Sequence, residues 1–177
     1  MLFGLLLFGT IVGAVVWFVA AYNNLLAAVH RSSQAWGNVD ALLRQRHEEI
    51  SSLVEICQRH LKYEQATFDR VIDARNTVFG ARQIEDTAAL GAAESELRAA
   101  LAVLYERAAA AELTADQRFV VLRERLAALD VGIGERCALF NEAVRQNNAA
   151  IGRFPGSVVA RLGGFRSRAP FEIDRHG

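Results

Sequence analysis

Proline is nearly absent from this chain of 177 residues, and its two prolines, Pro155 and Pro170, lie close to the C-terminus. Alternating runs of β-branched and aromatic residues between turn signals are also missing, which argues against a protein built of strands. Alanine, leucine, arginine and glutamate dominate instead, and all four favour helix. The sequence therefore predicts an all-α protein whose length leaves room for one anchor and one domain.

Net charge is missing as well, because 20 basic residues balance 20 acidic ones. A balanced charge gives no overall attraction to nucleic acid, so we expect no nucleic-acid partner. Cysteine is scarce: Cys57 and Cys137 stand far apart, without a CxxC partner. We interpret both as buried thiols rather than as a disulfide.

Motifs that carry chemistry are absent from the sequence. It has no Gly-x-Gly-x-x-Gly, Walker-type loop or Gly-x-Ser-x-Gly nucleophile turn. Two pairs of titratable residues do stand four residues apart: His60 with Glu64, and Asp69 with Asp73. A di-metal bundle site needs Glu-x-x-His on two helices, and that motif is missing. We interpret the pairs as solvated helix faces, and we expect no enzyme, no cofactor and no metal.

An uncharged apolar run covers residues 2–21. At 1.5 Å per residue, a helix of this length matches the ~30 Å hydrocarbon core of a bilayer. Trp17 and Tyr22 lie near its end, where aromatic rings favour the membrane interface. We predict a transmembrane anchor over residues 1–22 in a single-pass protein of the cell membrane, with the lipid bilayer as the partner of residues 2–21.

A cleaved signal peptide is the alternative to an anchor, because the small residues 19–21 resemble a cleavage site. The apolar run is longer than the roughly 7–15 residues usual for a signal peptide, and no lysine or arginine precedes it, which favours the anchor. Arg31, Arg44 and Arg46 follow the span. This positive-inside bias predicts a cytoplasmic soluble domain.

Apolar residues recur at three- and four-residue steps after the span, as expected of packed helices. The first helical region is predicted to end at Phe79-Gly80, and Thr114 is predicted to cap the third. The stripe of the first region is Trp36, Val39, Leu43, Ile50, Leu53, Cys57, Leu61, Phe68, Ile72 and Phe79. The second region carries Leu90, Leu97, Leu104 and Ala111. The third carries Phe119, Leu122, Leu126, Leu129, Ile133, Phe140, Val144, Ile151 and Phe154.

The first helical region is more than twice as long as the second, so the two do not match as straight helices. A break at Ser51-Ser52, where serine competes for backbone hydrogen bonds, would give four antiparallel helices. We therefore predict an N-terminal transmembrane helix followed by an antiparallel bundle over residues 23–154. Four helices are preferred, and three are the alternative if the first region is unbroken.

Residues 155–177 mix turn residues with apolar ones and are predicted to form an irregular, basic C-terminal segment. Two interpretations of this segment stay open. In the favoured one, apolar residues fold back to cap the open end of the bundle; they are Val158, Leu162 and Phe165. In the other, arginines contact anionic lipid headgroups; they are Arg161, Arg166 and Arg168.

Five residues are candidates for an interaction surface or for fixing helix register. They are Trp36, Asn38, Asn141, Asn147 and Asn148. Amides beside apolar seam positions specify register or bind a partner helix. Asn147 continues the seven-residue series of the third helical region, which favours a register role, and Trp36 fits an ordinary core aromatic.

Several short motifs stand at each end of the soluble part. After the span come Tyr22-Asn23, Ala35 to Asp40, Leu43, Arg44, Arg46 and Ile50 to Glu55. Near the C-terminus come Phe140 to Val144, Asn148 to Ile151, Phe154-Pro155, Gly164-Phe165 and Phe171-Glu172. In order and spacing these motifs resemble the LemA family, which commonly has proline where Ser52 stands and tyrosine where Phe140 stands.

The resemblance implies a bacterial single-pass membrane protein with a four-helix bundle and no established biochemical activity. Family members look like they serve in membrane-associated organisation, including magnetosome formation, and some lie beside genes for membrane peptidases. We predict a non-enzymatic interaction or scaffold module that binds an unknown protein partner or itself. The alternative is a ligand-sensing or membrane-protease-associated accessory protein. An apolar pocket among Trp36, Phe68, Ile133 and Phe140 would favour ligand sensing.

Overall fold

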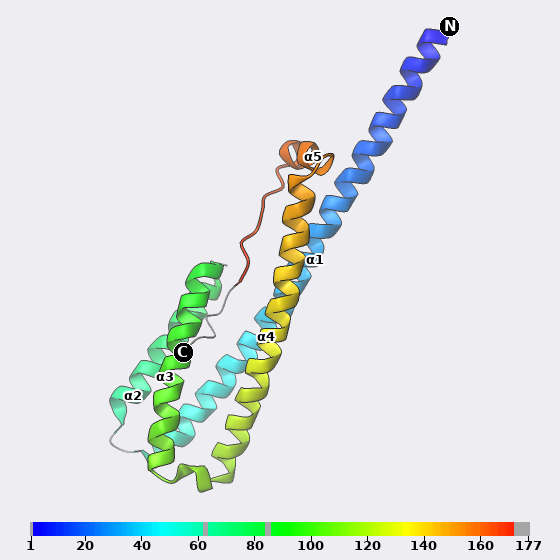
Figure 1. The fold of residues 1–177 in the computed structure, drawn as a ribbon. Coiled ribbons are helices and arrows are strands. Elements are labelled where there is room, and N and C mark those ends of the chain that lie inside the picture. The colour runs from blue at the N-terminus through cyan, green and yellow to red at the C-terminus, as the bar shows by residue number, and fades with distance from the viewer. Residues whose placement is uncertain (1, 62–63, 84–85, 172–177) are drawn as a thin grey trace. The chain divides into compact units, whose positions relative to one another are not determined.

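The computed structural model describes residues 2–61, 64–83 and 86–171 (Figure 1). These residues form helices, and no strand occurs among them. The helices are α1 (Leu2–His60), α2 (Gln65–Gln83), α3 (Thr87–Ala110), the 3-10 turn η1 (Leu113–Ala115), α4 (Gln117–Gly152) and α5 (Gly156–Gly163). The predicted all-α fold, with a long apolar helix at the N-terminus followed by a helical bundle, is confirmed.

The chain divides into two compact units. Unit 1 comprises Met1–Trp36 and Leu139–Pro170, and unit 2 comprises Gly37–Ala138 and Phe171–Gly177. The predicted division into 1–22, 23–154 and 155–177 stays a prediction.

In unit 2, ion pairs and hydrogen bonds define the direction of α2 against α1. Arg82 Nε lies 3.3 Å from Asp40 Oδ1, and Arg75 donates a hydrogen bond to the Ser51 hydroxyl. The residue numbers of α1 rise as those of α2 fall, so the two helices are antiparallel.

The first part of α4 is also antiparallel to α1 within unit 2. Arg46 Nε of α1 lies 2.9 Å from Asp130 Oδ1, and Glu49 Oε1 lies 3.8 Å from Arg125 Nη1. Together with α3, these segments form the predicted antiparallel four-helix arrangement.

The buried residues of α1, α3 and α4 follow the predicted stripes in unit 2. They include Val39, Leu43, Ile50, Leu53, Cys57, Leu90, Leu97, Leu104, Phe119, Leu122, Leu126, Leu129 and Ile133. In α2 the predicted Phe68 is buried, but the next two predicted positions are wrong by one residue. Val71 and Val78 are buried there, whereas Ile72 is half-buried and Phe79 is exposed. A new helix begins at Gln65, so the periodicity of α1 cannot be extrapolated across the break.

Two residues predicted to be buried are exposed, because each lies beyond the regular part of its helix. Ala111 is exposed at the C-cap of α3, and Phe154 is exposed after the end of α4.

The predicted break at Ser51-Ser52 is also wrong, because α1 continues through both serines to His60. Their hydroxyls donate to the carbonyls four residues earlier, at 3.0 and 3.4 Å, which lets serine stay inside a helix. The four helices arise from a break between His60 and Gln65 instead. The predicted end at Phe79-Gly80 is wrong for the same segment, since α2 continues to Gln83.

The N-terminus of α4 is capped by Asp116, not by the predicted Thr114. The Asp116 carboxylate accepts hydrogen bonds from the N–H groups of Arg118 and Phe119 at 2.7 and 3.3 Å. Thr114 lies in the 3-10 turn before it. A carboxylate satisfies two of the free N–H groups at a helix start and interacts well with its dipole, which explains the choice.

Candidate functional site

Helix α5 packs against α1 in unit 1, beside the end of the apolar run (Figure 1). Val159 and Ala160 of α5 are buried against Ala21 and Leu25 of α1, and Phe165 packs against this small cluster. The predicted fold-back therefore occurs, but through a helix where irregular structure was expected. Its buried residues are Val159 and Ala160, whereas the predicted Val158 and Leu162 are exposed.

Glycines allow α5 to turn back this tightly. A Cβ atom added at Gly156 would lie 2.1 Å from the carbonyl oxygen of Ala150, so only glycine fits where α5 begins. At the other end, Gly164 has a φ of 70°, and its N–H bonds to the carbonyl of Ala160 as a left-handed C-cap. The turn residues that suggested an irregular segment thus mark the two ends of a helix.

Two aromatic pairs join this C-terminal segment to the end of the apolar run. The rings of Trp17 and Phe154 are 5.4 Å apart, and so are those of Tyr22 and Phe165. Aromatic pairs at this separation contribute about 0.5–1.5 kcal/mol beyond the area that they bury. The contacts fix α5 at the level of residues 17–25 of α1.

The outer side of this segment is apolar and faces solvent. Phe154 and Leu162 are 75% and 73% exposed, and Val158 between them is 45% exposed. Three exposed arginines lie close to these residues in the sequence: Arg153, Arg161 and Arg166. Within the described part of the chain, none of the three has an ion-pair partner. An exposed apolar stripe among cationic side chains is typical of a surface that contacts lipid.

The third predicted headgroup residue, Arg168, has a different environment. Its guanidinium donates to the hydroxyls of Ser32 and Ser33 of α1, at 3.4 and 3.1 Å. Asn148 of α4 holds its backbone: the amide oxygen accepts from the Arg168 N–H at 3.0 Å, and the amide nitrogen donates to its carbonyl at 2.8 Å. Asn148 thus clamps the extended segment that follows α5.

The other amides predicted to fix register or bind a partner lie in different environments. Asn147 is buried, and its amide donates to Asn148 at a long 3.4 Å. Asn38 is exposed on α1, and Asn141 is half-buried on α4. The structure therefore places Asn147 and Asn148 together in unit 1, and a partner-binding role for any of the four stays a prediction.

The residues predicted to line an apolar pocket lie in two different units. Within unit 1, the rings of Trp36 and Phe140 lie 5.2 Å apart. Within unit 2, Phe68 and Ile133 are each only 2% exposed.

Unit 2 contains a buried ionic cluster that was not predicted from the sequence. Arg46 of α1 pairs with Glu94 of α3 and with Asp130 of α4, and both Arg46 and Glu94 are almost fully buried. The cluster ties three helices together. Glu94 sits among the alanines and leucines of α3, and its spacing alone does not distinguish it from surface glutamates such as Glu96.

Burial dominates the electrostatics around this cluster. The cost of desolvating the charged form raises the pKa of Glu94, although Arg46 opposes the shift. Burial likewise raises the pKa of Tyr105 to about 12 and that of the Cys57 thiol to about 11. Cys57 and Cys137 are buried and free, as predicted, and Cys57 is not activated as a nucleophile.

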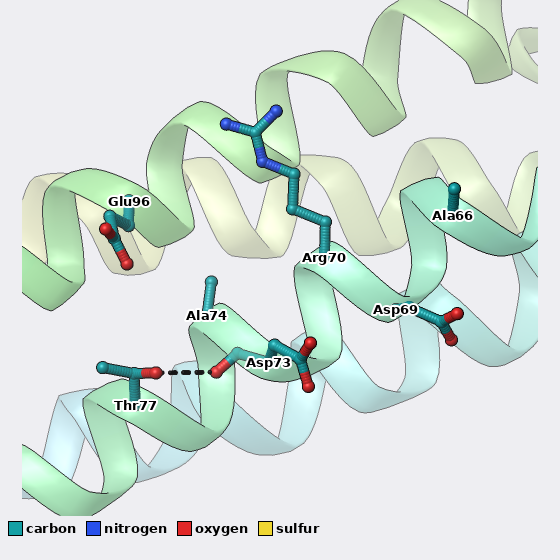
Figure 2. A pocket seen from close by; sticks show the side chains of 7 residues that line it. All are labelled: Ala66, Asp69, Arg70, Asp73, Ala74, Thr77 and Glu96. Carbon is teal, nitrogen blue, oxygen red and sulfur yellow. Dashed lines mark hydrogen bonds between the residues drawn. The ribbon is translucent and has the colours of Figure 1, made fainter.

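A groove between α2 and α3 gathers charged side chains (Figure 2). It has a volume of about 520 Å³ and is lined by Ala66, Asp69, Arg70, Asp73, Ala74, Thr77 and Glu96. Figure 2 shows Arg70 extending towards α3 while Asp69 and Asp73 point away from it. Gln65 Nε2 donates to Asp69 Oδ1 at 2.8 Å. Over the described residues, no group of three or more metal-binding side chains converges.

These features define a class of protein, a helical bundle that carries at its N-terminus one helix long and apolar enough to cross a membrane. A family model, the LemA family, matches residues 35–177, and the chain belongs to that family. A comparison with curated proteins found no match. The resemblance noted in the sequence is thereby confirmed.

Proposed function

We propose that the chain is a membrane-anchored, non-enzymatic interaction module that holds its helical bundle at the surface of the cell membrane. One observation carries the proposal: every residue from 2 to 20 is helical and exposed, and nearly all are apolar. Leaving apolar surface in water costs about 25 cal/mol for each Å². A bilayer removes that cost, and the segment has the length to span it.

The packing of α5 supports an anchor over a cleaved signal peptide. Cleavage after Ala21 would remove Trp17, which contacts Phe154, and Ala21 itself, which packs against Val159 and Ala160. A segment that is discarded has no reason to contribute to the packing of the mature chain. In addition, residues 19–21 lie inside the continuous helix α1.

The charges near the end of the span support a cytoplasmic bundle. Arg31 follows the apolar run in sequence, and Arg153, Arg161 and Arg166 belong to the C-terminal segment that packs against residues 17–25. Arginines next to a span favour the cytoplasmic side. A reporter that fluoresces only in the cytoplasm, fused after Gly177, tests this orientation, and periplasmic activity of an alkaline phosphatase fusion would contradict it.

The interaction role rests on the exposed apolar residues of the bundle. Val131, Leu139 and Phe79 are 64%, 56% and 43% exposed. A photo-crosslinking amino acid at Val131 or Phe79 of the full chain in cells tests this role, with Glu55, an exposed charged position, as the matched control.

The expected result is a defined protein adduct at an apolar position that disappears when residues 1–21 are deleted. Adducts with only lipid or small molecules would support the ligand-sensing alternative. A protein adduct that survives the deletion would contradict a tethered module, because binding would then not need the membrane.

A further inference from the structure

We propose that α5 and Phe154 form a foot that lies on the surface of an anionic bilayer, so that the chain contacts the membrane through this second element as well as through its span. The inference rests on the proposed membrane anchor. The partner is the headgroup region of the leaflet from which the span emerges.

Geometry places the foot at the right depth. Val159 and Ala160 pack against Ala21 and Leu25, immediately after the exposed apolar run of α1 ends. A helix that spans the hydrocarbon core with residues 2–21 has this part of α1 in the headgroup region. Trp17, whose ring contacts Phe154, belongs to a residue type that prefers that interface.

The exposed face of the foot fits that environment. Val159 and Ala160 of α5 pack against α1. Leu162 and Val158 of the same helix, and Phe154 before it, are also apolar but are exposed. A short helix with apolar residues on both sides needs two apolar neighbours. The first is α1, and the bilayer beside the span supplies the second.

Charge selects the kind of lipid. Arg153, Arg161 and Arg166 are exposed and lie close to these apolar residues in the sequence, and none has an ion-pair partner among the residues that the structure describes. Arg168 is excluded from the foot because it donates to Ser32 and Ser33. Three cationic side chains at this level would attract phosphatidylglycerol or another anionic lipid more strongly than a zwitterionic one.

Spin-label depth measurements on the full chain in nanodiscs test the foot. A nitroxide is attached at Leu162→Cys, at Leu139→Cys as the matched control, and at Val12→Cys inside the span. The native cysteines are buried, and burial raises the pKa of Cys57 to about 11, so they react slowly. The unsubstituted chain gives the labelling background.

In nanodiscs of phosphatidylglycerol and phosphatidylcholine, we expect the label at 162 to lie about 5–10 Å into the interface, accessible to oxygen and protected from a water-soluble nickel chelate. The label at 139, also an exposed leucine, should stay open to the chelate. Protection at 162 should weaken in phosphatidylcholine alone and when Arg153, Arg161 and Arg166 are all replaced by glutamine.

Full chelate access at 162 with a lipid-embedded label at 12 would overturn the foot and leave the anchor intact. Chelate access at 12 would overturn both. Protection at 162 that does not change with anionic lipid or with the three arginines would also contradict the proposal, because the foot would then not select an anionic bilayer.

Discussion

At the scale of single residues, the buried pair of Arg46 and Glu94 ties α1 to α3 in unit 2. Replacing Arg46 by methionine leaves Glu94 without its partner in a site where desolvation already disfavours its charge. We expect the free energy of unfolding to fall by about 3–5 kcal/mol, measured by chemical denaturation in mild detergent.

Arg44→Met is the matched control for this prediction. Arg44 pairs with Asp40 in the same helix, but its side chain is 65% exposed, and such pairs contribute at most about 1 kcal/mol. Equal losses for the two variants would mean that burial does not set the importance of Arg46.

His47 gives the bundle a pH dependence. Burial, followed by the charges of Arg75 and Arg82, lowers the pKa of His47 below its usual 6.5. His47 therefore binds a proton less readily in the folded state than in the unfolded state. Stability from this source is complete above pH 6.5 and falls as the pH drops below that value.

Denaturation at pH 7.5 and at pH 5.5 measures the effect. The loss of stability between these two pH values should be smaller in His47→Gln than in the unsubstituted chain. His30→Gln, at an exposed position in α1, serves as the control. An unchanged pH dependence in His47→Gln would assign the acid sensitivity to other groups.

At the scale of helices, Gly156 decides whether α5 docks on α1. In Gly156→Ala the new methyl group would meet the Ala150 carbonyl at 2.1 Å, and we expect a loss of about 1–3 kcal/mol in the stability of α5. Hydrogen exchange of the amides of α5 should accelerate.

Gly152→Ala is the matched control, because nothing lies within 4 Å of a Cβ atom there and alanine favours helix. Exchange in α5 should be unchanged by this substitution. Equal acceleration in both variants would show that the close approach at Gly156 does not hold α5 in place.

Most helices could be predicted from the sequence. Which of their residues are buried could be predicted only where a helix is continuous. The stripes of α3 and α4 come from strict three- and four-residue repeats, so they transfer directly to buried faces. The predicted break at Ser51-Ser52 was wrong because a serine hydroxyl can also donate to a carbonyl of its own helix. Both serines do so in α1. In α2 the predicted positions after Phe68 were wrong, because a new helix begins at Gln65.

The candidate site was predictable in composition but not in geometry. The arginines, phenylalanines and glycines near the C-terminus suggested a folded-back or lipid-facing segment. The buried face of α5 is the one that packs against Ala21 and Leu25 of α1, a tertiary contact that spacing does not encode. Glu94 was missed for the same reason, since its ion-pair partner Arg46 lies on another helix, α1.

At the scale of the whole molecule, the account rests on the anchor. If residues 2–21 span the bilayer, the bundle that follows them is tethered at the membrane, and the part of α1 on which α5 packs lies at the membrane interface. If they are removed after export, the contacts of Trp17 and Ala21 with α5 have no role in the mature protein.

The most direct test is to isolate membranes from cells that express the full chain, wash them with alkaline carbonate and measure the intact mass of what remains. An anchored protein stays in the membrane pellet with residues 2–21 attached. A chain found in the wash, or one whose mass corresponds to cleavage near Ala21, would show that residues 2–21 are not an anchor.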